Sequence, residues 1–200
     1  MKYLTRSIAI LIILMSNAGA QDRSKANFFP LRVGDEWNFN NDPHRLRIQV
    51  VDTSDIYGYR FYVVQETSFT DVPPPVVRRK YYTIDSLGNV LRLADTTRFS
   101  GVYIWYKSTD SVDESWKAMA NSDFLGGVID PYKITIESRT DTVITSRGVY
   151  CHCLRFHIDN LTESDTDYWD WFAVGVGIVK RAYGNYSAKG WILTSYKLVE

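Results

Sequence analysis

Two cysteines and two histidines stand close together in the second half of the chain, at Cys151, His152, Cys153 and His157. On a regular β-strand every second side chain shares a face, which would bring Cys151, Cys153 and His157 together. Thiolates and imidazoles bind soft metals such as zinc or copper(I). At ~3.3 Å per residue, however, Cys153 and His157 lie about 13 Å apart along a strand, too far for one ion to bridge. We therefore predict no metal site at this cluster.

The two cysteines also raise the question of a disulfide. An oxidising compartment would permit Cys151 and Cys153 to pair. Residues i and i+2 of a strand have Cα atoms near the ~7 Å limit for a disulfide, so closure would strain the bond. We expect two separate thiols instead, at least one of them packed as a small apolar side chain.

An acidic run at Glu163, Asp165, Asp167 and Asp170 begins like a calcium-binding loop. Calcium is bound by several carboxylate oxygens, which such a run could supply. Trp169 occupies the next expected ligand position, and the glycine of the sharp turn is missing. We interpret the run as a solvated hairpin tip.

Motifs for nucleophilic, metal-assisted or dinucleotide-dependent catalysis are absent from the sequence. There is no Gly-x-Ser-x-Gly elbow and no His-Glu-x-x-His helix. Gly175-Val176-Gly177 lacks the third glycine and the following helix of a dinucleotide loop. We predict no catalytic residue and no cofactor. Hydrolysis by two carboxyl groups stays an alternative, because the spacing that such a pair needs is spatial.

Aromatic side chains are the candidate ligand-binding residues. Aromatic residues line sugar and lipid sites because they offer large apolar contact with few rotatable bonds. Two strand-like segments, residues 102–106 and 169–172, are apolar on both faces. Each is either a central strand covered on both sides or a strand with one face on a cavity. For the aromatic residues, packing in the core is the alternative to ligand binding. The residues predicted to contact a ligand are Tyr103, Trp105, Trp169 and Trp171.

The elements that position these residues are predicted to be strands, because apolar and polar residues alternate from Trp37 onward. Only residues 111–120 could form a short helix, since Ser111 and Glu114 fit a capping box. The close spacing of the strands predicts an all-β fold: an antiparallel meander forming a curled sheet or barrel, with at most one or two short helices. The predicted strands are residues 45–52, 59–66, 76–84, 90–94, 102–107, 132–139, 141–146, 149–158, 167–174, 178–183 and 191–198.

The first twenty residues have the organisation of a secretory signal peptide. Two basic residues precede an apolar run at residues 8–15, and Ala18-Gly19-Ala20 offers small residues for cleavage. The run is far shorter than the ~20 residues that span a bilayer. We expect cleavage near Ala20 and Gln21, a secreted or periplasmic location, and a single β-rich domain over residues 21–200.

Charge and hydropathy exclude several partners. No cysteine follows Ala20, as a bacterial lipid anchor would need, and no second apolar stretch approaches membrane length. We expect no stable membrane insertion once the signal is removed. Without Lys2 and Arg6 the chain has 21 basic against 23 acidic residues, a net charge of −2, which predicts no binding to nucleic acid.

Two segments carry a family resemblance. FFPLRVGDEW at residues 28–37 resembles the opening of a group of exported bacterial all-β proteins of unknown function. GVYCHCLRF at residues 148–156 and AVGVGIVKR at residues 173–181 resemble that group's closing half. The group is similar in outline to curled-sheet carriers such as the lipoprotein localisation factors. The resemblance implies a fold and a compartment, and no catalytic residue.

Three functions are compatible with these observations. The first is a non-catalytic exported β-domain of the bacterial envelope that holds an apolar small molecule or contacts another envelope component. This hypothesis predicts a cavity lined by residues such as Trp105 and Trp171. The second is a secreted carboxylate-dependent hydrolase, and the third is a surface interaction module without a pocket.

Overall fold

The computed structural model describes residues 27–95, 101–108, 111–121, 128–164, 166–184 and 190–199. The predicted signal peptide, its cleavage site and Asp165 lie outside the described residues. No helix in the described ranges is long and apolar enough to cross a membrane.

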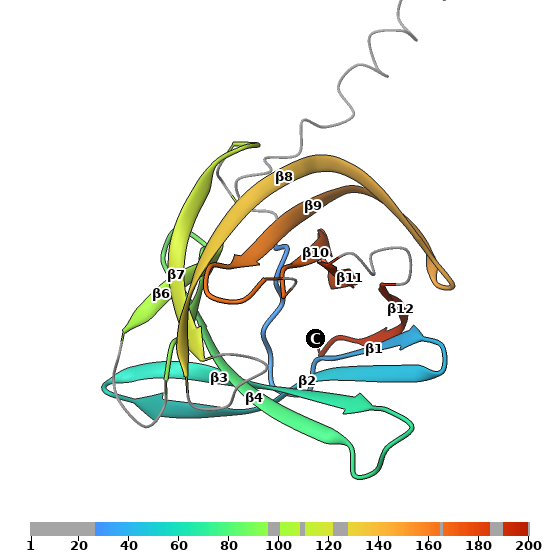
Figure 1. The fold of residues 1–200 in the computed structure, drawn as a ribbon, viewed down its shortest axis with the longest axis horizontal. Helices are drawn as coiled ribbons and strands as arrows, with labels where there is room; N and C mark the ends of the chain where they lie inside the picture. Colours follow the sequence, from blue (N-terminus) through green and yellow to red (C-terminus); the bar gives the residue numbers. More distant parts are fainter. Residues whose placement is uncertain are drawn as a thin grey trace, which may run out of the picture.

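Twelve antiparallel strands form one strongly curled, nearly closed sheet (Figure 1). The described ranges contain no α-helix, and the predicted all-β fold class is confirmed. The strands are β1 (Glu36–Asn41), β2 (His44–Ile56), β3 (Tyr59–Phe69), β4 (Val76–Ile84), β5 (Val90–Leu93), β6 (Val102–Tyr106), β7 (Ser115–Asn121), β8 (Ile129–Thr145), β9 (Gly148–Asn160), β10 (Tyr168–Ala173), β11 (Gly177–Tyr183) and β12 (Trp191–Lys197).

The sheet order follows the chain except at two places. The first and last strands, β1 and β12, pair with each other and join the two ends of the meander. The sheet then has its two edges at β6 and β7, which are neighbours in sequence but not in the hydrogen-bonded order. We call the junction between these two edge strands the seam.

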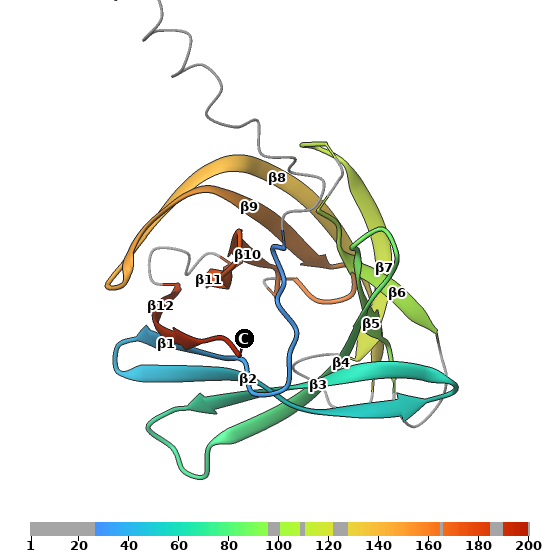
Figure 2. The same ribbon diagram turned by 180° about the vertical axis from the view of Figure 1, so that it is seen from behind.

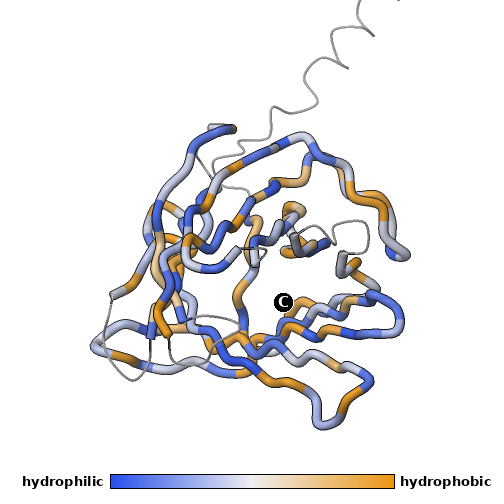
Figure 3. Tube along the Cα trace, in the orientation of Figure 1, coloured by the Kyte–Doolittle hydropathy of each residue, from blue (hydrophilic) through white to orange (hydrophobic). Residues whose placement is uncertain are grey.

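Alternation of side chains explains why these segments form strands with one face inside. Leu46, Ile48 and Val50 of β2 are buried at 0–5% exposure, while the residues between them are more exposed. Figure 3 shows the same alternation of apolar and polar residues along most of the sheet. Tyr57 and Gly58 connect β2 to β3 with positive φ angles of 53° and 81°, which suits a two-residue hairpin turn.

Four assignments differ from the sequence expectations, the first being β1, which is not among the predicted strand ranges. Residues 132–139 and 141–146 belong to the single long strand β8, whose pairing with β9 is interrupted by bulges. Residues 111–120, which could have formed a helix, make a turn and then enter β7. The Glu114 amide donates to the Ser111 carbonyl, but pairing with β8 takes over from Ser115. The apolar segment 102–106 is the edge strand β6 and not a central strand.

The two segments that carry the family resemblance meet in space. The Trp37 indole donates to the Val176 carbonyl oxygen at 2.6 Å. A Cβ at Gly177 would lie 3.1 Å from the Trp37 ring, and Gly177 has a φ of +92° that favours glycine. Gly175 lies in the turn between β10 and β11, and Gly177 is the first residue of β11.

Candidate functional site

A cluster of charged side chains lies inside the curled sheet. It is contributed by five strands, three of the first six and two of the last six. Its members are Glu66 on β3, Lys80 on β4, Tyr106 on β6, Asp170 on β10 and Arg181 on β11, and we call them the interior cluster.

Arg181 stands at the centre of the interior cluster. Its Nε and Nη2 donate to Asp170 Oδ1 and Oδ2 at 2.6 and 2.9 Å, a two-pronged contact. Its Nη1 lies 3.1 Å from Glu66 Oε1. The second oxygen of this carboxylate, Glu66 Oε2, lies 2.9 Å from Lys80 Nζ. The four charged side chains are 0–11% exposed. Since two cations face two anions, the buried charges balance.

Tyr106 extends the interior cluster to the edge strand β6. Its hydroxyl donates to Asp170 Oδ2 at 2.6 Å, and the residue is buried. Burial raises the pKa of Tyr106 well above 10.0, the nearby Asp170 carboxylate raises it further, and Arg181 opposes the shift. Burial lowers the pKa of Arg181, but attraction to Asp170 and Glu66 outweighs it, so this pKa is also raised. Tyr106 therefore stays a neutral donor and Arg181 a cation.

The chain before β1 crosses the interior of the sheet (Figures 1 and 2). The Phe29 ring lies 5.3 Å from the Tyr106 ring, 5.8 Å from the Tyr82 ring and 5.2 Å from the Phe172 ring, measured between centroids. Phe28 and Leu31 on either side are buried. The interior is therefore partly filled by an aromatic segment of the protein's own chain.

Backbone hydrogen bonds hold this segment, residues 27–35, at both of its ends. At one end the Gly175 amide donates to the Asn27 carbonyl oxygen at 2.8 Å. At the other end the Gly34 amide donates to the Val50 carbonyl oxygen at 2.8 Å, and the Val50 amide donates to Asp35. Between these anchors Phe29 is held by the ring contacts described above.

Phe29 lines two cavities. The smaller, of about 30 Å³, has room for one water molecule and reaches the interior cluster at Glu66 and Arg181. The larger, of about 270 Å³, is lined mostly by apolar side chains, among them Leu154 and Phe156. Phe29, Tyr106 and Phe172 line both cavities. Phe29 thus borders an apolar space and a smaller space that reaches buried charge.

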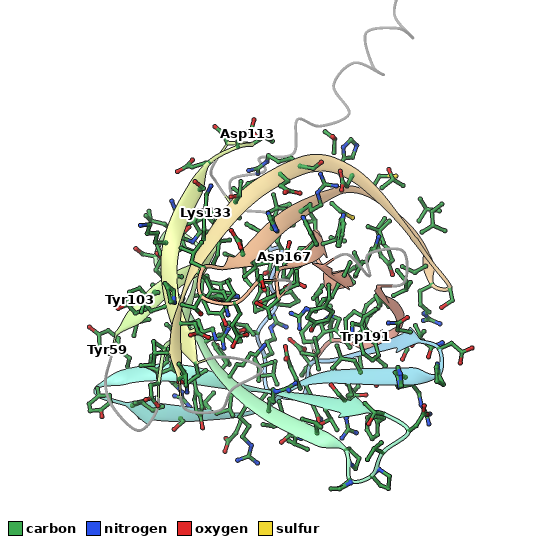
Figure 4. The ribbon with its side chains drawn as sticks, viewed as in Figure 1. Tyr59, Tyr103, Asp113, Lys133, Asp167 and Trp191 are labelled. Atoms are coloured by element: carbon green, nitrogen blue, oxygen red, sulfur yellow. The ribbon has the colours of Figure 1, made fainter. Side chains whose placement is uncertain are left out.

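The aromatic residues predicted from sequence to contact a ligand lie elsewhere. Trp105 is fully buried, with its ring 5.2 Å from that of Tyr132 and the Arg92 guanidinium 4.4 Å from the ring centroid. Tyr103 packs over Gly101 at the periphery of the molecule (Figure 4). Among the described residues, neither these two side chains nor Trp169 and Trp171 line the cavities beside Phe29. Ligand contact by the four stays a prediction.

Trp169 lies on the outer face of β10, since its neighbours Tyr168 and Asp170 are the buried ones. Its indole stacks on the His157 ring, with centroids 4.4 Å apart, and donates to Glu137 Oε2 at 3.0 Å. His157 in turn lies between Glu137, at 3.3 Å, and Asp167, at 3.1 Å.

Trp171 extends this outer row of aromatic and charged side chains. Its indole donates to Asp141 Oδ2 at 2.8 Å, and the Lys180 ammonium sits 4.3 Å from its ring centroid. Arg155 pairs with Asp141 at 3.1 Å on the same face. Although it faces outward, Trp171 is only 8% exposed.

Neither polar cluster singled out from sequence assembles as one site. Cys151 is exposed and Cys153 buried, and both are free thiols, as predicted. Burial raises the pKa of Cys153 to about 11. His152 between them has a φ of 57°, so the two cysteines do not share a face as they would on a regular strand. No metal-binding group of His, Cys, Asp or Glu occurs in the described ranges.

The acidic run is also divided by the sheet. Asp167 pairs with His157 on the outer face, whereas Asp170 pairs with Arg181 inside. The interpretation as a solvated hairpin tip is therefore wrong for Asp170, whose side chain is fully buried. β10 carries it into the interior, between the buried Tyr168 and Phe172.

The interior cluster was missed by reasoning from sequence, although a signal for it exists. Asp170 is two residues away from both Tyr168 and Phe172, which are buried, and so shares their face of the strand. Lys80 shares a face with the buried Tyr82 in the same way. A charged residue at a position where the alternation places apolar residues indicates a buried charge with an ion-pair partner. Which charges pair depends on the curl of the sheet, and period-two alternation does not contain that information.

The fold and interior together define a class: a curled antiparallel sheet that encloses an ion-paired cluster and an aromatic segment of its own chain. No protein-family model and no curated protein matches the sequence. Among solved structures, a Bacteroides fragilis protein described as exported, with a YmcC-like fold, matches with a TM-score of 0.51 and 13% identity, over 86% of this chain and 100% of that one.

A Parabacteroides distasonis protein described as a lipoprotein matches with a TM-score of 0.44 and 10% identity, over 86% of this chain and 99% of that one. The Bacteroides likeness shows that this chain has a YmcC-like fold.

Proposed function

We propose that the protein is a non-catalytic extracytoplasmic binding protein. It holds an apolar or amphipathic small molecule inside its curled sheet, in and around the space beside Phe29. The apolar part of the ligand occupies the larger cavity, and a polar group reaches toward the interior cluster.

The observation that carries this proposal is that Phe29 lines both cavities. Small-molecule sites combine apolar walls with a few convergent polar groups, and the two cavities together supply both. The larger cavity, at about 270 Å³, is close to the lower end of the usual range for such sites.

Two observations support an extracytoplasmic location: the sequence of residues 1–20 and the description of a solved structure with a similar fold. The N-terminal sequence has the three regions of a secretory signal. The Bacteroides fragilis protein with the same kind of fold is described as exported. Mass spectrometry of the protein from cell fractions tests this location: a chain beginning near Gln21 outside the cytoplasm is expected, and an intact cytoplasmic chain would contradict it.

A binding role is supported over carboxylate-dependent hydrolysis by the lining of the two cavities. Glycoside hydrolysis needs two carboxyl groups that face each other across the substrate. Glu66 is the single carboxylate among the described residues that line these cavities. It is engaged by both Lys80 and Arg181.

Titration with the apolar fluorescent probe N-phenyl-1-naphthylamine tests the proposal. We expect the probe to bind with a blue-shifted emission, and Phe29→Ala to raise its affinity several-fold because truncation enlarges the space that the probe enters. Tyr59→Ala is the matched control, since Tyr59 is 57% exposed on a hairpin. No probe binding by either the unaltered protein or Phe29→Ala would refute the proposal.

A further inference from the structure

A second depression lies on the outer face of the sheet, away from Phe29. It is a groove of about 610 Å³ across β1, β2, β3 and β12. Leu46 is buried and faces inward, so Arg45 and Arg47 on either side of it face outward. We call this depression the arginine groove. Its lining residues are Asn38, Phe39, Asn40, Arg45, Leu46, Arg47, Phe69 and Thr194, of which Phe39 and Leu46 are buried.

Strand register brings these side chains together. Arg45 pairs with Asn40 of β1 and with Phe69 of β3, and Arg47 pairs with Asn38. Directly opposed residues on one face of an antiparallel pair have Cβ atoms about 4.5–5.5 Å apart. Two guanidinium groups, two amides and one aromatic ring therefore border the same groove.

The groove is positively charged and lacks an internal counter-charge. No carboxylate is among its described lining residues. In the part of the chain that the structure describes, neither Arg45 nor Arg47 forms an ion pair. The Glu36 carboxylate accepts a hydrogen bond from Asn38 at 2.8 Å and pairs with neither arginine.

Two polar atoms next to the groove have no hydrogen-bond partner. Arg47 Nε is shielded from solvent without an acceptor. Thr67, which pairs with Arg47 across β2 and β3, is 4% exposed, and its Oγ1 also lacks a partner. Buried donors are nearly always satisfied, because an unmade hydrogen bond costs about 1–3 kcal/mol. The Arg47 side chain therefore keeps hydrogen-bonding capacity that the described residues do not use.

We propose that the arginine groove binds a small organic anion through a carboxylate or phosphate group. Arg45 and Arg47 contact the anionic group, because the planar guanidinium matches both oxyanions with two parallel hydrogen bonds. Phe69 contacts the apolar or ring-shaped part of the same molecule, and the Asn40 amide offers a further hydrogen-bond donor. The groove volume lies within the usual range for small-molecule sites. This site is independent of the interior cavity.

Isothermal titration calorimetry with phenyl phosphate and with benzoate tests the inference and distinguishes the two anionic groups. We expect the protein to bind at least one of these probes. Arg45→Gln and Arg47→Gln should each weaken binding by about tenfold or more. Arg47→Lys should also weaken it, because lysine keeps the positive charge but cannot form the two parallel hydrogen bonds of a guanidinium. Far-UV circular dichroism checks that each variant is folded, and the exposed Arg45 gives a test if Arg47→Gln does not fold.

Arg60→Gln is the matched control. Arg60 lies on β3, and its guanidinium donates to Thr53 Oγ1 at 3.1 Å, outside the groove. This variant should keep the affinity of the unaltered protein. Absence of binding by both probes would overturn the inference, and so would an equal loss in Arg60→Gln and Arg45→Gln, which would indicate diffuse charge attraction.

Discussion

Arg181 contacts both buried carboxylates of the interior cluster, so its charge decides whether Asp170 and Glu66 are tolerated inside the sheet. A buried ion pair contributes little net stability because both ions lose their hydration. Losing one partner is costly, since it leaves an uncompensated charge. The cluster is therefore better explained by conformational specificity: its contacts align β3, β4, β6, β10 and β11 in one arrangement around the cavities.

Tyr106 makes the interior cluster sensitive to alkaline pH. Its folded-state pKa is raised above 10.0, so its contribution to stability is complete below about pH 10 and is lost as the pH rises toward the folded-state pKa. Tyr106→Phe removes this group. Above pH 10 we expect the free energy of unfolding of the variant to fall less steeply than that of the unaltered protein, by up to about 1.4 kcal/mol per pH unit.

Urea unfolding at several pH values between 9 and 11.5 measures this difference in slope. Tyr59→Phe, which alters an exposed tyrosine, serves as the control and should retain the slope of the unaltered protein. Parallel curves for Tyr106→Phe and the unaltered protein would show that Tyr106 ionises as freely in the folded state as in the unfolded one.

At the scale of elements, no strand ladder joins β6 to β7 among the described residues. Side chains close the seam, together with one backbone hydrogen bond from the Asn121 amide to the Ala94 carbonyl oxygen. The Trp116 indole on β7 donates to the Ile104 carbonyl oxygen on β6 at 2.9 Å. Beside it, Lys107 pairs with Glu114 at 3.4 Å and sits over the Trp116 ring. A strand edge with few cross-strand bonds opens more readily than a fully paired strand. The seam is thus the weakest junction in the sheet order.

Trp116→Phe tests this interpretation, because it keeps an aromatic ring and removes the N–H donor. We expect faster amide hydrogen exchange in β6 and a loss of about 1 kcal/mol in stability, the usual net value of one hydrogen bond. Trp169→Phe is the matched control, since it removes an indole donor from β10, which is paired on both sides. Equal exchange of β6 in both variants would argue against a seam held by Trp116.

Most strands could be predicted from sequence, and the exceptions have physical causes. Period-two alternation locates β2 and β3 because one face of each lies on the core. It does not distinguish β7 from a helix, since Ser111 and Glu114 do form a local turn and the pairing with β8 that follows is non-local. The interior cluster needs five strands at their final curvature. Phe29 could not be placed inside, because nothing in its local pattern shows that the chain before β1 enters the sheet.

At the scale of the whole molecule, the two ends of the chain close the sheet together. β1 pairs with β12 and so belongs to the sheet, whereas the segment before β1 passes through the interior. The beginning of the described chain therefore contributes both to the sheet and to its core. Asp35 connects these roles. Its Oδ2 accepts from the Arg32 amide at 2.9 Å, and its Oδ1 accepts from the Val199 amide at 2.7 Å. Arg32 also donates to the Val199 carbonyl oxygen at 2.8 Å.

Asp35→Ala should therefore weaken the whole sheet and not a single turn. The carboxylate is 1% exposed and holds two charge-assisted hydrogen bonds, so we expect the free energy of unfolding to fall by about 2–4 kcal/mol. Asp55→Ala, at an exposed position of β2, is the control and should change stability by less than about 0.5 kcal/mol. Urea unfolding followed by tryptophan fluorescence measures both variants. If the two variants lose equal stability, the junction of the chain ends does not hold the sheet closed; a larger loss in Asp35→Ala, with faster amide exchange in both β1 and β12, is the expected result.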